Sequence, residues 1–90
     1  MKLTDRANIP LQVMTRQVGE ETVILNLEGG IYYGLDSVGA RIWQWMADGK
    51  TLAGICDATQ EEFEVEREIL EGDVVRLARE LLDQGLILLA

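Results

Sequence analysis

Polar and apolar residues roughly alternate from Gln12 to Val18, with Val13 and Thr15 on one side and Met14 and Arg16 on the other, which is typical of a β-strand. The segment 19–21 (Gly-Glu-Glu) then interrupts the pattern and predicts a turn. Residues 22–27 and 31–35 are rich in the β-branched, aliphatic and aromatic residues that favour strands. Between them, residues 28–30 (Glu-Gly-Gly) tolerate the positive φ angles of a hairpin turn. The pattern therefore predicts consecutive strands connected by hairpins.

Helical spacing begins directly after the last of these strands. Asp36 can accept hydrogen bonds from the free amides of a first helical turn, and apolar residues then recur at steps of three and four up to Gly49. This predicts a helix over residues 37–48. Thr51 is a candidate N-cap for a second, shorter helix, whose apolar side is formed by Leu52, Ile55, Cys56 and Thr59.

Residues 64–84 carry the strongest helical pattern. At about 100° per residue, one narrow apolar stripe is formed by Leu70, Val74, Leu77 and Leu81. Phe63 and Val65 indicate a bend between this helix and the preceding one. Gly85 can end the helix in the left-handed conformation, and residues 86–89 are so apolar that we expect them to pack back onto the domain.

A chain of 90 residues is the size of one compact domain. We expect residues 1–10, which are mixed and polar, to form a flexible N-terminal arm, and residues 11–90 to form a single α+β domain. A domain of this size buries only about 60–65% of the surface that its unfolded chain exposes, which favours a binding surface over a deep enclosed site.

Charge excludes several classes of function. The chain has 8 Lys and Arg residues against 16 Asp and Glu residues, a net charge of −8, which opposes binding to nucleic acid or to an anionic membrane. A winged-helix DNA-binding protein remains an alternative by its elements, but the third helix carries only Arg67, Arg76 and Arg79 as bases. No apolar run resembles a signal peptide or a membrane span, so we expect a cytoplasmic protein.

The residue types that are missing restrict the chemistry further. The chain has no His and a single cysteine, Cys56, so it can form neither an internal disulfide nor a Ser-His or Cys-His nucleophile pair. We therefore expect no catalysis, no metal and no cofactor. Cys56 lies on an apolar helix side and is interpreted as a small buried hydrophobe. A group of acidic residues near helix starts is interpreted as a solvated face: Glu61, Glu62, Glu64, Glu66 and Glu68.

Two features of the first helix have competing interpretations. The run Gly34-Leu35-Asp36-Ser37 resembles the phosphopantetheine attachment site of acyl carrier proteins, with Ser37 as the attachment point, whereas the simpler interpretation is a capped helix start. Trp43 and Trp45 are about 200° apart on a helix, so we expect one, Trp43, in the core and the other partly exposed.

The strand over 31–35 ends the predicted sheet, and the helices that follow it cannot pair with its free edge. An extended peptide could add there as a further strand, with its side chains held between this strand and the third helix. On this hypothesis we expect the amide of Tyr33 to be one of the donors to the peptide. A capped or twisted edge with no ligand is the alternative.

Several stretches in combination resemble the PqqD family over residues 12–88. They are Ile24-Leu25-Asn26-Leu27, Gly30, Tyr32-Tyr33-Gly34-Leu35-Asp36, Gly39-Ala40-Arg41-Ile42-Trp43, Leu77, Leu81-Leu82 and Gly85-Leu86-Ile87. The family usually has Asn at the helix start, where Asp36 can keep the N-cap role. The resemblance implies a winged-helix-like fold, in which a three-stranded antiparallel sheet is followed by three helices. It also implies recognition of the leader segment of a ribosomally made precursor peptide, which adds as a strand near residues 31–35 and lies against the third helix.

A free-standing chain of this length is similar to the stand-alone leader-binding subunits of lasso-peptide systems. The resemblance then implies three partners: the precursor's leader, a separate cysteine-type leader peptidase and an ATP-dependent cyclase. A PqqD-like chaperone that serves a radical enzyme is the close alternative.

The predicted contact residues lie on the strand and on one shoulder of the third helix, where Asp73 and Arg76 can hold a peptide backbone or a charged side chain. We predict a peptide-binding site formed by Leu27, Ile31, Tyr32, Tyr33, Gly34, Leu35, Ile69, Asp73, Arg76, Leu77 and Glu80. Strand alternation places Tyr32 and Tyr33 on opposite faces of the sheet, and the sequence leaves open which of the two faces the core.

Overall fold

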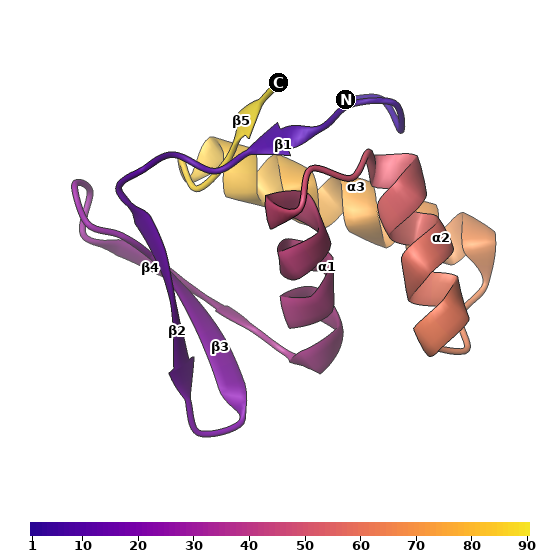
Figure 1. The fold of residues 1–90 in the computed structure, drawn as a ribbon, viewed down its shortest axis with the longest axis horizontal. Coiled ribbons are helices and arrows are strands. Elements are labelled where there is room, and N and C mark those ends of the chain that lie inside the picture. Colours follow the sequence, from indigo (N-terminus) through magenta and orange to yellow (C-terminus); the bar gives the residue numbers. More distant parts are fainter.

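A computed structural model describes all residues from Met1 to Ala90. Three antiparallel strands, β2 (Val13–Val18), β3 (Glu21–Asn26) and β4 (Ile31–Leu35), form one sheet in the order β2-β3-β4 (Figure 1). The predicted strands and hairpins are confirmed. Because β3 is the central strand, β2 and β4 each have one edge that pairs with no other strand of the sheet.

Three helices follow the sheet: α1 (Ser37–Ala47), α2 (Leu52–Glu62) and α3 (Arg67–Asp83). Asp36 caps α1 by accepting from the amide of Gly39 at 2.8 Å, and Thr51 caps α2 in the same way. The helix α3 begins at Arg67 and not at the expected Glu64, because Phe63 is extended and partly buried, so that the chain turns between α2 and α3. No helix has both the length and the hydropathy needed to cross a bilayer.

Both ends of the chain are part of the domain (Figure 1). Within residues 1–10, which the sequence analysis set apart as an N-terminal arm, β1 (Ala7–Asn8) pairs antiparallel with β5 (Leu88–Leu89). Ala7 is buried, and the carbonyls of Leu3 and Asp5 accept from the free amides in the first turn of α2 at 2.8 and 3.0 Å. These two bonds satisfy helix donors that would otherwise be unpaired and connect the N-terminal segment to α2.

The C-terminal segment packs back as predicted. Gly85 has a φ of 73° and ends α3 in the left-handed region, and the side chains of Leu86 and Ile87 are then wholly buried. They complete a core to which β3, all three helices and the tail contribute.

The expectation that one of the two tryptophans is partly exposed is wrong. Trp43 and Trp45 are 3% and 7% exposed, because α1 is a central helix that contacts the sheet, α2 and β1. The indole nitrogen of Trp43 donates to the hydroxyl of Thr15 at 2.9 Å. The guanidinium of Arg41 lies 4.5 Å from the ring centre of Trp45 and covers that side of the helix.

Candidate functional site

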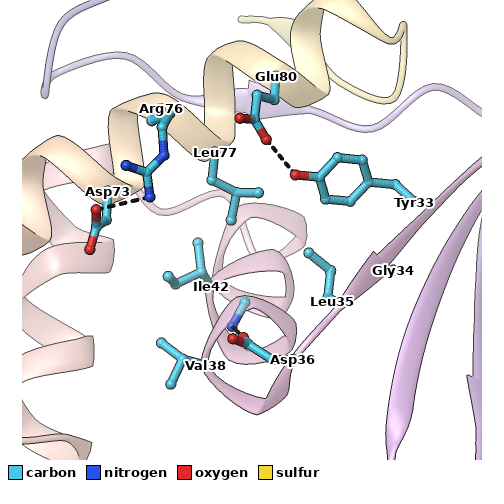
Figure 2. Close-up of a pocket in the computed structure, with 11 residues that line it drawn as sticks. Tyr33, Gly34, Leu35, Asp36, Val38, Ile42, Asp73, Arg76, Leu77 and Glu80 are labelled. Carbon is cyan, nitrogen blue, oxygen red and sulfur yellow. Dashed lines mark hydrogen bonds and ion pairs between the residues drawn. The ribbon is translucent and has the colours of Figure 1, made fainter.

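A groove opens between the end of β4, the first turns of α1 and the middle of α3 (Figure 2). Its apolar part is formed by Leu35 from β4, Val38 and Ile42 from α1, and Leu77 from α3. The hollow has a volume of about 280 Å³, which is small for an enclosed cofactor site but sufficient for a side chain or two of an extended peptide.

The rim of the groove is polar. The Tyr33 hydroxyl donates to the carboxylate of Glu80 and so connects β4 to α3 (Figure 2). One turn earlier on α3, Arg76 forms an ion pair with Asp73 at 3.0 Å. Arg76 is the only base among the residues that line the groove, and its remaining N–H donors are free to bind a peptide.

The contact with Glu80 affects the titration of Tyr33. The hydrogen bond, followed by partial burial and by the charge of Glu80, raises the pKa of Tyr33 above its ordinary value of 10.0, and Arg76 opposes this rise. The pKa of Tyr33 is therefore higher in the folded state than in the unfolded state. The contact with Glu80 stabilises the fold fully at a pH below the unfolded-state pKa, and this stabilisation is lost as the pH rises through the folded-state pKa.

We predict that tyrosinate absorbance in a Tyr32→Phe variant, which isolates Tyr33, has its midpoint above pH 10.0. A further Glu80→Ala change should lower this midpoint. A midpoint at or below 10.0 before the Glu80 change would contradict the contact across the groove.

The free edge of β4 can be assigned residue by residue. The amide of Leu27 donates to the carbonyl of Gln12 at 3.0 Å, so Gln12 and Leu27 form a hydrogen-bonded pair next to the Val13–Asn26 pair. Hydrogen-bonded pairs alternate along an antiparallel ladder, and the odd-numbered residues of β3 therefore direct their backbone groups toward β2. The even-numbered residues of β3 therefore bond to β4, where their partners are Ile31, Tyr33 and Leu35. Along a strand these directions alternate, so Tyr32 and Gly34 direct their N–H and C=O groups away from the sheet.

This assignment corrects the role expected for the Tyr33 amide, which bonds within the sheet to Ile24. The donors available to an added strand are the amides of Tyr32 and Gly34. Neither of them takes part in any turn or loop hydrogen bond.

Most of the predicted site residues line the groove: Tyr33, Gly34, Leu35, Asp73, Arg76, Leu77 and Glu80. Tyr33 is the tyrosine on the helix side, whereas Tyr32 is 73% exposed on the opposite face of the sheet. Ile31, also on β4, and Ile69, one turn before Asp73, are exposed but lie outside the lining of the groove. Leu27 is exposed in the turn after β3 and is not part of the groove either.

The sequence prediction missed the part of the groove that α1 provides, namely Asp36, Val38, Gly39 and Ile42. A signal for it existed. Asp36 follows the strand without an intervening loop, so the first turn of the capped helix must lie beside the end of β4.

The other candidates of the sequence analysis have structural roles. Cys56 is fully buried, and burial raises the pKa of its thiol, which disfavours a reactive thiolate. Glu62 accepts two hydrogen bonds from Arg41. On α3, Arg67 pairs with Asp57 and Glu71, and Arg76 pairs with Asp73, which leaves Arg79 as the one base of this helix outside an ion pair and counts against a basic face for DNA.

Comparison with known proteins decides the family. A family model described as coenzyme PQQ synthesis protein D (PqqD) matches residues 21–87. The chain belongs to the PqqD family. The expected fold class, a three-stranded antiparallel sheet followed by three helices, is confirmed for this PqqD-family chain. No match is found among curated proteins.

Two solved structures are similar to this PqqD-family chain. TbiB1 in complex with the TbiA(beta) leader peptide is 37% identical, with a TM-score of 0.80, and the match covers 88% of this chain and 92% of that one. A lasso peptide synthetase B1 complexed with the leader peptide is 28% identical, with a TM-score of 0.84, and the match covers 92% of this chain and 98% of that one. The resemblance to leader-binding lasso proteins that the sequence analysis identified is therefore confirmed.

Proposed function

We propose that this protein binds the leader segment of a ribosomally made precursor peptide by adding it as a fourth strand to the edge of β4. The observation that carries the proposal is the pair of outward-directed residues, Tyr32 and Gly34, on a strand edge that opens beside the groove. Backbone bonds to these residues supply affinity that is independent of sequence. Side chains of the peptide that enter the groove supply selectivity.

The similarity to two proteins solved with leader peptides supports the proposal. The similarity to a lasso peptide synthetase B1 favours a lasso-peptide pathway over a radical-enzyme pathway for this protein. The protein then acts as a non-catalytic adaptor in the cytoplasm. It delivers the precursor to a separate cysteine-type leader peptidase and an ATP-dependent cyclase, and raises the local concentration of the core peptide at these enzymes.

The test is a calorimetric titration of the isolated protein with the leader of a precursor peptide encoded beside it. We expect saturable binding with one leader per protein chain, without any enzyme present. A peptide of the same composition in scrambled order is the control, and equal binding of both peptides would contradict leader recognition.

Charge reversal of Arg76 provides a narrower test of the groove. We predict that Arg76→Glu weakens leader binding about tenfold, because it removes the only cation of the lining and leaves Asp73 unpaired. Arg79→Glu is the matched control, since it makes the same charge change on the same helix outside the groove. Equal effects of the two variants would mean that net charge matters and the position of Arg76 does not.

A further inference from the structure

The sheet has a second free edge, on β2, which the proposed leader site does not use. The register that assigns β4 also assigns β2: the backbones of Gln12, Met14 and Arg16 are directed toward β3. The backbones of Val13, Thr15 and Gln17 are therefore directed away from the sheet. The Val13 amide bonds to the carbonyl of Pro10 at 3.0 Å, but the amides of Thr15 and Gln17 are in no turn or loop hydrogen bond.

This edge lacks two of the features that prevent strands from associating, a bulge and a proline. The pairing of β2 with β3 runs without a bulge from Val13 to Val18, and the strand contains no proline. Residues 14–18 are exposed. A shallow hollow also lies next to this strand, between Thr15 and the last turn of α1, lined further by Trp43, Gln44, Ala47 and Asp48.

The outward-directed residues of β2 are arranged symmetrically about Thr15. When two such strands are placed antiparallel with Thr15 facing Thr15, Val13 faces Gln17, and each outward residue meets an outward residue. The two Thr15 residues then exchange their N–H and C=O bonds, and each Gln17 amide donates to the Val13 carbonyl of the other copy. We infer that two copies of this protein associate through β2 into one continuous six-stranded sheet.

The charges of the strand favour a second copy as the occupant. The chain carries a net charge of −8, yet β2 has no carboxylate and contains one base, Arg16. In the symmetric register Arg16 lies opposite Met14 of the other copy, so the two guanidinium groups are offset and each stem covers an apolar side chain. The edge therefore offers self-complementary backbone bonds on a strand that brings no carboxylate of its own against the second acidic molecule.

This association does not depend on the proposed function. The central strand β3 separates β2 from β4, so a dimer formed through β2 leaves both β4 edges free at the outer ends of the sheet. A Gly34→Pro variant, which alters only the β4 edge, should therefore dimerise like the original protein.

The test combines sedimentation velocity with a cross-link. Between about 10 and 500 µM, we expect the sedimenting mass to rise from the 10.1 kDa monomer toward twice that value. Thr15→Pro removes an outward amide without breaking a backbone bond to β3, and it should weaken the association at least tenfold. It also removes the hydroxyl that accepts from Trp43, so Thr15→Val, which removes the hydroxyl but keeps the amide, is the control and should dimerise like the original protein. A monomer over the whole range, or a dimer unaffected by Thr15→Pro, would overturn the inference.

The cross-link tests the register even if the proline variant fails to fold. At Thr15 the two facing Cα atoms are expected about 5.5 Å apart, within the range of a disulfide, so Thr15→Cys should form a covalent dimer on mild oxidation. At Met14 the corresponding atoms are about 8 Å apart in the same register, and Met14→Cys should cross-link poorly. The native Cys56 is buried and does not compete. Equal cross-linking at both positions would overturn the symmetric pairing.

Discussion

Replacing Gly34 by proline is expected to weaken leader binding at least about a hundredfold while the domain stays folded. The substitution removes one of the two outward amides of β4 and places a ring where the incoming strand must approach. It breaks no bond to β3, because the Gly34 backbone is directed away from the sheet. Calorimetric titration measures the loss of binding, and circular dichroism with thermal melting measures the fold.

Two controls separate this effect from a general disturbance of the strand. Gly34→Ala keeps the amide, and a Cβ atom added at this position meets no other atom within 4 Å, so this variant should bind the leader like the original protein. Tyr33→Pro, in contrast, removes an amide that bonds to Ile24 and should lower the melting temperature as well as the affinity. Full leader affinity in the Gly34→Pro variant would contradict strand addition at β4.

Truncation of Ile87 to alanine is expected to destabilise the domain by about 3 kcal/mol, since a large buried aliphatic side chain leaves a cavity when it is removed. Ile87 is wholly buried although it lies only a few residues from the end of the chain. For a domain of this size the loss corresponds to a melting temperature lower by about 12–24 °C. Chemical denaturation gives the free energy of unfolding directly.

Leu88→Ala is the matched control on the neighbouring residue. Its side chain is 54% exposed, so its truncation should cost less than about 1 kcal/mol. Equal losses at the two positions would mean that the tail contributes through its length and backbone pairing and that burial of Ile87 has little effect.

The features of the fold that the sequence predicted depend on short-range signals. The caps at Asp36 and Thr51 and the left-handed Gly85 each act within one helical turn, and each is found where the sequence places it. The pairing of β1 with β5 could not be predicted in this way. Ala7 pairs with Leu89, at the opposite end of the chain, and two-residue strands have no recognisable pattern of their own.

The candidate site could be predicted only where short-range patterns define it. Alternation along β4 and helical spacing on α3 identified the two walls of the groove. The direction of each backbone amide, however, follows from the register of all three strands, and in the folded structure the hydrogen bond from the Leu27 amide to the Gln12 carbonyl fixes this direction. The burial of Trp45 could not be predicted from the sequence either, because it depends on the tertiary contacts of α1 and on the position of the Arg41 guanidinium over the indole ring.

Amide hydrogen exchange followed by NMR, with and without the leader peptide, tests the central claim most directly. Ile31, Tyr33 and Leu35 are paired within the sheet, whereas Tyr32 and Gly34 are the outward-directed donors. Leader binding is therefore predicted to slow exchange at the Tyr32 and Gly34 amides more than at their neighbours on β4, together with chemical-shift changes along α3 from Asp73 to Glu80. Saturating leader that leaves exchange at Tyr32 and Gly34 unchanged would contradict strand addition at this edge.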